Sequence, residues 1–280
     1  MKRGNGMLAT IRRHPTAVFG AIVLAVMALV AILAPWLGTT DPLALSPIRR
    51  LRPPQADWWF GTDMLGRDVY SRVLYGARVS LTVGLAVALF SSVIGMAIGL
   101  VTGFVRWLDA VVMRVMDGLM SSPSVLLAIA LIALTEASLR NVIIAITITE
   151  IPRVVRLVRG LVLTLREQPY VEAAVASGTR MHGILLKHIL PNIVAPMLVQ
   201  ATYICASAMI TEAILSFIGA GTPPNIPSWG NIMAEARSLF QIAGYLILFP
   251  GLFLSLTVLA VNLLGDGMRD ALDPRLARRM

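Results

Sequence analysis

The sequence predicts an all-α, polytopic membrane protein with six transmembrane helices. Of its 280 residues, 57% are apolar and 14% are charged, whereas an average soluble domain has roughly 25% charged residues. The apolar residues form long runs, and a helix needs about 20 of them to cross a hydrocarbon core ~30 Å thick. The basic residues gather at the ends of these runs. We expect one helical membrane domain, with no separate soluble domain and no internal repeat.

The net charge of +9 would suggest a nucleic-acid partner in a soluble protein. Here the basic residues flank apolar runs, where they set the orientation of membrane helices, so we expect no nucleic-acid binding. Cys205 is the single cysteine and cannot form an internal disulfide. No histidines and cysteines have the spacing of metal ligands, so we also expect no metal site.

The first predicted span covers residues 16–37 and follows a basic tail, residues 1–15. The run is too long for the apolar part of a signal peptide and has no A-x-A cleavage pattern, so we expect a retained helix. Residues 38–79 are too polar to span a membrane and are predicted to lie along its extracytoplasmic surface. Trp58, Trp59 and Tyr70 suit the interfacial belt.

Residues 80–266 are predicted to hold the other five spans. The second span, residues 80–104, carries Gly95, Gly99 and Gly103 at a spacing that lets two helices approach closely. The third contains Asp117 and is interrupted at residues 121–123. The third to sixth spans are predicted at residues 112–134, 140–163, 193–218 and 242–264.

Six spans with a cytoplasmic N-terminus place the C-terminal tail, residues 267–280, in the cytoplasm as well. Most of the 24 lysines and arginines then fall on the cytoplasmic side, as the positive-inside rule requires. The exception is the stretch from Arg49 to Arg78, which is arginine-rich although it is predicted to be extracytoplasmic.

Residues 165–191 form a polar loop of mixed charge on the predicted cytoplasmic side. Glu172 to Ala176 suits a short helix, which Gly178 can end in a left-handed conformation. Ile184 to Leu190 suits a second helix, and Pro191 should interrupt it. The sequence therefore predicts two short helices at a sharp angle, forming a compact knob on the membrane face.

The order of residues in this loop resembles the EAA loop of ATP-binding-cassette (ABC) importer permeases. In that family the loop forms a coupling helix that sits in a cleft of the ATPase subunit. Small alanines suit close helix approach, and the glycine suits the turn. The resemblance implies an ATPase-coupling role for Glu172, Ala173, Ala174, Gly178, His188, Leu190 and Pro191.

Further motifs resemble the dipeptide/oligopeptide/nickel branch of these permeases, and the C-type subunit in particular. They lie at residues 59–63, 65–68, 212–219, 227–230 and 262–274. The resemblance covers nearly all of the chain after about residue 15 and implies the type I ABC importer permease fold. It implies transport of dipeptides or oligopeptides, with nickel, glutathione, opines or another small solute as alternatives.

The resemblance also implies partners and a location. These are a homologous B-type permease subunit, two ABC ATPase subunits, an extracytoplasmic solute-binding protein and the lipid of the bacterial inner membrane. The chain has no G-x-x-x-x-G-K-[ST] motif. We therefore expect ATP and Mg²⁺ to bind the partner ATPases, and this chain to bind no cofactor and to be no enzyme.

Three residues are candidates for the translocation pathway, namely Asp117, Glu212 and Ser216. Asp117 could equally face the cytoplasmic interface. An ionised carboxylate at the bilayer centre costs ~2.5–3.5 kcal/mol, so Glu212 should face protein or water. It could bind a cationic part of the solute, but we favour hydrogen bonds that support a bend after Ser216. For Glu150 we expect an ion pair with Arg153.

Two other classes of membrane protein fit the sequence less well. A channel or ion-coupled secondary transporter would form its pathway in one chain and carry ionisable residues near the bilayer midplane. The predicted spans hold few of these. An intramembrane enzyme would need a nucleophile–base pair or a metal cluster such as H-E-x-x-H, and the sequence shows neither.

Overall fold

The computed structural model describes residues 15–272, which are mostly helical and contain no β-strand. The predicted tails, residues 1–15 and 267–280, lie mostly outside this part of the chain. The elements are α2 (Pro15–Leu33), η1 (Ala34–Trp36), η2 (Pro47–Arg49), α3 (Val69–Thr102), α4 (Arg106–Met120), α5 (Ser124–Ala133), α6 (Leu139–Leu165), α7 (Pro169–Ala176), α8 (Met181–Gly183), η3 (Ile184–Ile189), α9 (Leu190–Phe217), α10 (Trp229–Glu235), η4 (Arg237–Leu239) and α11 (Tyr245–Leu272).

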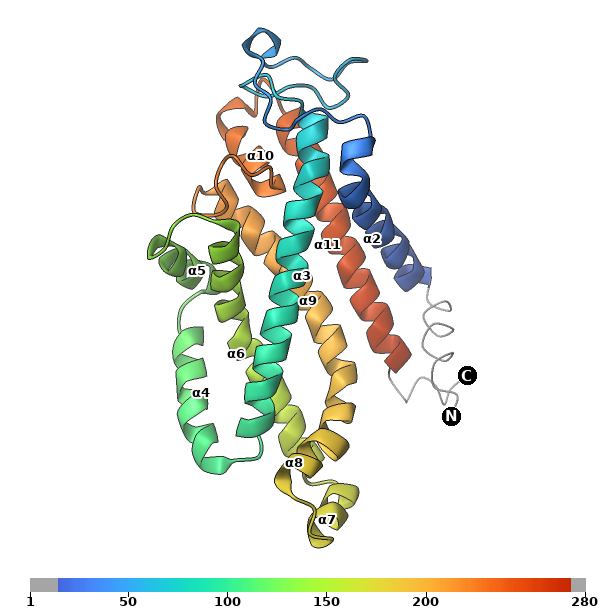
Figure 1. The fold of residues 1–280 in the computed structure, drawn as a ribbon, viewed down its shortest axis with the longest axis vertical. Coiled ribbons are helices and arrows are strands. Elements are labelled where there is room, and N and C mark those ends of the chain that lie inside the picture. The colour runs from blue at the N-terminus through green and yellow to red at the C-terminus, as the bar shows by residue number, and fades with distance from the viewer. Residues whose placement is uncertain (1–14, 273–280) are drawn as a thin grey trace.

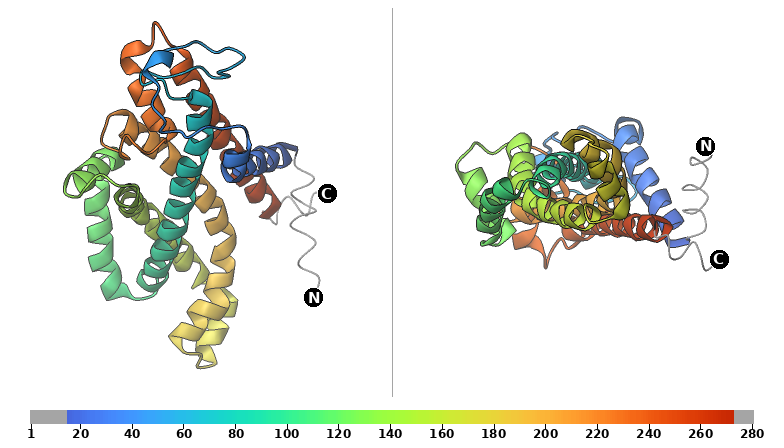
Figure 2. Two further views of the ribbon diagram at one scale, coloured as in Figure 1. Left: turned by 45° about the horizontal axis from the view of Figure 1, so that its top comes forward. Right: turned by 90° about the horizontal axis from the view of Figure 1, so that it is seen from below.

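The helices form an elongated bundle with two distinct ends (Figure 1). Helix α3 packs against α6 and α9, and α11 packs against α9 and α2. Figure 2 shows α2 lying on the outside of α11. The segment before α3 and helix α10 gather at one end, whereas α7 and α8 lie at the other (Figure 1). The segment predicted to be extracytoplasmic and the predicted cytoplasmic knob are therefore at opposite ends of the bundle.

Four helices within residues 15–272 are long and apolar enough to span a membrane, and they are α2, α3, α11 and the continuous segment Met181–Phe217. Helices α4 and α5, bent by 89° at their break, raise the number to five if they count as one span. The predicted number of six is therefore not confirmed. The predicted span that falls short is α6, because Glu150 and four arginines reduce its apolar character.

Helix α3 begins at Val69, earlier than the span predicted from residue 80. Asp68 caps it by accepting a hydrogen bond from the backbone N–H of Ser71 at 2.9 Å. Arg72 made this stretch look too polar for a buried helix. In the structure Arg72 is 1% exposed and bonds Asp63 and Glu235, so its charge is neutralised inside the protein.

The helix that follows α7 continues past Pro191, but its type changes immediately before this proline. Element η3 is a π-helical turn, in which the N–H of Leu190 donates to the carbonyl of Leu185. This wider turn shifts the hydrogen-bond register immediately before the proline. Pro191 then falls in the first turn of α9, where a proline needs no N–H partner.

The glycines of α3 form a close helix contact, as their spacing predicts. A Cβ atom placed on each of these glycines would lie 2.6–2.7 Å from the side chain of a valine on α6. The pairs are Gly95 with Val154, Gly99 with Val158, and Gly103 with Val162. All three valines are fully buried. The glycines thus form a groove that the valine ridge of α6 fills, and this contact fixes α6 against α3.

We expect Gly99→Ala to destabilise the protein by about 1–3 kcal/mol, because the new methyl group overpacks a tight contact. The matched control is Gly160→Ala in α6, where an added Cβ has no heavy atom within 4 Å. That change should leave stability unchanged or raise it by up to ~1 kcal/mol through helix propensity. Thermal unfolding of the purified chain in detergent measures both. Equal unfolding temperatures for the two variants would contradict the groove.

Candidate functional site

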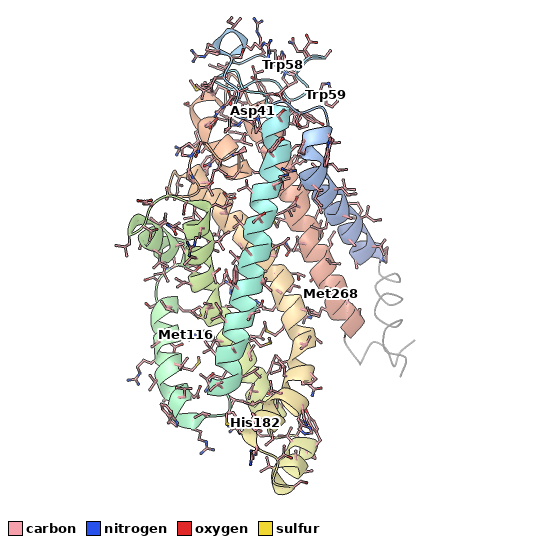
Figure 3. The ribbon with its side chains drawn as sticks, in the orientation of Figure 1. Asp41, Trp58, Trp59, Met116, His182 and Met268 are labelled. Atoms are coloured by element: carbon pink, nitrogen blue, oxygen red, sulfur yellow. The ribbon has the colours of Figure 1, made fainter. Side chains whose placement is uncertain are left out.

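Helix α7 and the residues after it form the predicted knob at one end of the bundle. Figure 3 marks this end with His182. Pro169 occupies the first turn of α7, where its fixed φ favours helix initiation. After the helix, Gly178 has φ +74°. Its N–H donates to the carbonyl of Val175 at 2.9 Å, and the N–H of Thr179 donates to the carbonyl of Ala174 at 3.0 Å. This paired C-terminal cap fixes the angle of the turn.

The seven predicted coupling residues divide between the surface and the interior of the knob. Glu172, Ala173, Gly178 and Pro191 are exposed. Ala174 is 8% exposed and faces inward with Val171, where α7 packs against η3. His188 and Leu190 are half-buried. The structure thus brings all seven to one end of the molecule and leaves Glu172, Ala173 and Gly178 accessible.

The exposed face of the knob carries apolar side chains as well. Val175 is 54% exposed and Leu186 is 59% exposed, and both belong to the segment that holds the coupling residues. Tyr170 and Met181 are also exposed large apolar residues of this segment. Exposed apolar side chains with polar neighbours are typical of a protein–protein contact.

The knob is joined to two long helices without a flexible connection. Helix α6 ends at Leu165, three residues before α7, and the segment from Met181 continues as one helix to Phe217. Asn192 ties the two sides together, since its side-chain amide donates to the carbonyl of His188 at 2.7 Å and contacts the hydroxyl of Tyr170 at 3.4 Å. A displacement of the knob would therefore move α6 and α9.

Two ion pairs that the sequence did not predict connect α4 to α6. Arg156 Nη2 lies 2.7 Å from Asp117 Oδ1, and Arg159 Nη2 lies 2.7 Å from Asp109 Oδ2. Asp117 was a candidate pathway residue, and the structure assigns it to this contact, with its side chain 61% exposed. The available signal was Asp109 just before the third predicted span, Asp117 inside it, and a basic stripe in the fourth span, formed by Arg153, Arg156 and Arg159.

Glu150 pairs locally, as predicted. Its carboxylate lies 3.1 Å from Arg153 Nη1 and accepts a hydrogen bond from Ser207 at 3.3 Å. Each arginine of the basic stripe on α6 therefore has a carboxylate partner among the described residues. These pairs account for the charges that lower the hydropathy of α6.

Glu212 and Ser216 lie together near the end of α9, inside the protein. Glu212 is 0% exposed, and its Oε1 accepts hydrogen bonds from Ser216 at 2.8 Å and from Thr222 at 3.5 Å. Asn231 of α10 donates to the carbonyl of Thr222 at 3.1 Å. These bonds hold the chain where it turns from α9 into α10. They are hydrogen bonds of the kind predicted to support a bend after Ser216.

Helix α10 carries Trp229, the largest fully buried side chain of the described residues. Its indole N–H donates to the carbonyl of Val73 at 3.0 Å, which joins α10 to the first turns of α3. Within residues 15–272 no group of three or more His, Cys, Asp or Glu residues is placed to hold a metal ion.

Comparison with known proteins gives the following matches. The family model of the binding-protein-dependent transport system inner membrane component matches residues 71–278. The model of the N-terminal transmembrane domain of oligopeptide transport permease C matches residues 6–54.

Similar curated proteins match along almost the whole chain. The probable peptide ABC transporter permease protein y4tQ of Sinorhizobium fredii is 53% identical over 268 residues, which cover 96% of this chain and 92% of the relative. The dipeptide transport system permease protein DppC of Alkalihalophilus pseudofirmus is 41% identical, with coverage of 95% and 88%. The glutathione transport system permease protein GsiD of Pectobacterium atrosepticum is also 41% identical, with coverage of 95% and 89%.

Proposed function

The chain belongs to the family of binding-protein-dependent transport system inner membrane components, and from this premise we propose that it is the C-type permease subunit of an ABC importer for peptides. The observation that carries the substrate class is the 53% identity to a probable peptide permease, together with the identity to a dipeptide permease. The match of residues 6–54 to the N-terminal domain of oligopeptide permease C supports the C-type assignment.

Glutathione is the second candidate solute, because a glutathione permease is also 41% identical over most of the chain. Glutathione is itself a tripeptide, so both candidates belong to one chemical class. Specificity within that class would reside largely in the extracytoplasmic binding protein that delivers the solute.

The proposed assembly contains a homologous B-type permease, two ABC ATPase subunits and the binding protein in the bacterial inner membrane. The knob would face the cytoplasm, and so would both termini of the chain. In this arrangement α2, α3, the bent pair α4–α5, α6, α9 and α11 make six crossings. ATP and Mg²⁺ would bind the ATPase subunits, and the permease would contribute half of the pathway.

Coupling would run through the knob. Its exposed coupling residues and apolar side chains would fill a cleft of the ATPase subunit, and the capped turn at Gly178 keeps the knob rigid. When ATP draws the ATPase subunits together, the knob would be displaced and would carry α6 and α9 with it. The ion pairs of Asp109 and Asp117 with α6 would then pass this motion to α4.

Ala173→Trp tests the proposed contact, because a bulky side chain on an exposed, small position of α7 should block insertion into a cleft. We expect co-purification of the cognate ATPase subunits to fall about tenfold, a loss of ~1.4 kcal/mol in binding. Uptake of a labelled dipeptide into proteoliposomes should fall to background, while the thermal stability of the permease stays unchanged.

The matched control is Ala137→Trp, an exposed alanine in the connection between α5 and α6. It should retain both the ATPase subunits and uptake. If Ala173→Trp also retained both, the knob would not be the coupling element. If the ATPase subunits bound but no peptide or glutathione were taken up, the proposed substrate class would be wrong.

A further inference from the structure

A small polar cavity lies at the end of the bundle opposite the knob, in the segment that precedes α3. Its volume is about 300 Å³, near the lower limit for small-molecule sites. Two carboxylates, Asp57 and Asp68, and three aromatic residues, Trp58, Trp59 and Tyr70, line it with Gly38 and Thr40. Figure 3 shows Trp58 and Trp59 at this end. The described lining residues include no lysine, arginine or histidine.

Asp68 is a buried carboxylate without a cationic partner in the described part of the chain. Asp68 is 9% exposed. Oδ2 accepts hydrogen bonds from the backbone N–H and the hydroxyl of Ser71. Oδ1 has no hydrogen-bond partner among residues 15–272. Asp68 therefore caps α3 through Oδ2 alone, and Oδ1 is available to a cation that enters the cavity.

The aromatic residues form a fixed wall beside this carboxylate. The rings of Trp59 and Tyr70 meet edge to face, with centroids 4.9 Å apart. The hydroxyl of Tyr70 donates to the carbonyl of Leu37 at 3.0 Å, which holds its ring in place. Trp59 is 62% exposed, so it stands at the edge of the cavity. Tryptophan and tyrosine ring faces attract cations.

Arg49 already shows the preference of this wall for cations. Its guanidinium carbon lies 5.0 Å from the ring centroid of Trp58. Arg49 does not line the cavity, so this contact leaves the carboxylates of Asp57 and Asp68 free. Two buried arginines lie at the same end of the bundle, and both Arg67 and Arg72 form ion pairs with Asp63 and Glu235.

We propose that this cavity binds an alkylammonium group, with Asp68 and Asp57 as its counter-charges and the aromatic rings against its alkyl carbons. A hard metal ion fits less well, since Ca²⁺ takes six to eight oxygen ligands, whereas these walls are largely aromatic. The ammonium group could come from the amino terminus of a peptide or from a lysine side chain of a delivering protein. The chemistry is the same in both cases.

The test is ligand-observed saturation-transfer NMR on the full-length chain in lipid nanodiscs. The probes are alanyl-alanine, which has an α-ammonium group, N-acetyl-lysine amide, which has an ε-ammonium group, and N-acetyl-alanyl-alanine, which has neither. We expect saturable binding of the first two and none of the third. The tighter of the first two identifies the source that the cavity prefers. The measurement needs no ATP and no uptake, so its outcome is separate from that of the coupling proposal.

Variants locate the binding in the cavity. Asp68→Asn removes the charge but keeps an oxygen that can cap α3, and we expect affinity for both ammonium probes to fall tenfold or more. Asp57→Asn, on an exposed residue, should weaken binding without any effect on folding. Trp59→Ala should weaken binding, and Trp59→Phe should restore it.

The matched control is Asp41→Asn, since Asp41 is a carboxylate of the same segment that does not line the cavity. It should bind as the wild type does. Equal binding of N-acetyl-alanyl-alanine, or unchanged affinity in both Asp57→Asn and Asp68→Asn, would overturn the proposal.

Discussion

Arg72→Met is expected to lower the free energy of unfolding by about 3–5 kcal/mol, because it breaks a buried ion-pair network by removing one member. Arg72 is 1% exposed, and its Nη1 lies 2.6 Å from both Asp63 Oδ2 and Glu235 Oε2. Arg67 contacts the same two carboxylates at 2.6 and 2.5 Å. Two positive and two negative charges therefore balance, and the variant would leave an uncompensated carboxylate inside the protein.

Two further variants separate this effect from the loss of a side chain. Arg72→Met combined with Asp63→Asn removes one charge of each sign, so stability should partly recover in a double-mutant cycle. Arg50→Met, on an exposed arginine of the same segment, should change stability by less than ~0.5 kcal/mol. Denaturant unfolding measures these variants and the Asp63→Asn single variant that the cycle requires. Additive effects of the Arg72 and Asp63 changes would rule out the network.

This network also explains where sequence reasoning failed for the fold. Apolar runs predicted most helices correctly, because length and hydropathy are local properties. The first turns of α3 were assigned to a polar surface segment because Arg72 is charged. Its partner Glu235 lies 163 residues further along the chain, and no local pattern shows that such a distant carboxylate neutralises it.

The turn in the knob was predictable for the opposite reason. A glycine after a short helix is a local signal, and Gly178 has the left-handed φ that it predicts. The continuation of the helix through Pro191 was not predictable, because the π-helical turn before it depends on packing. Ala174 shows the same limit. The motif groups it with Ala173, but the contact of α7 with η3 buries one alanine and exposes the other.

The ion pairs between α4 and α6 were missed because the charges along one helix do not show which residues of another helix they contact. In the sequence, basic residues that flank apolar runs indicate charges that orient the helices in the membrane, and Asp117 is a candidate pathway residue. In the structure they meet across two helices. Met116 is the one buried residue among the 15 of α4, so apolar packing attaches this helix weakly and the ion pairs supply much of its connection to α6.

Asp109→Arg is therefore expected to abolish peptide uptake while leaving most of the bundle folded. The new guanidinium would face Arg159, whose side chain is 30% exposed, and like charges at contact distance repel by roughly 1–4 kcal/mol. Helix α4 would keep the pair of Asp117 with Arg156 but would be repelled from α6 at Arg159, so movement of the knob would reach it poorly. Dipeptide uptake into proteoliposomes should fall at least tenfold, with the ATPase subunits still bound.

The charge exchange Asp109→Arg with Arg159→Asp restores an attractive pair in the reverse direction, and we expect it to recover much of the lost uptake. Arg114→Asp, on an exposed residue of α4 without an ion-pair partner among residues 15–272, is the control for a charge change on the same helix and should transport normally. Recovery of uptake in the exchange variant would require contact between positions 109 and 159. If each charge change impaired uptake independently, the two losses would add in the double variant. Loss of uptake that persists in the exchange variant would mean that α4 does not receive its motion through this pair.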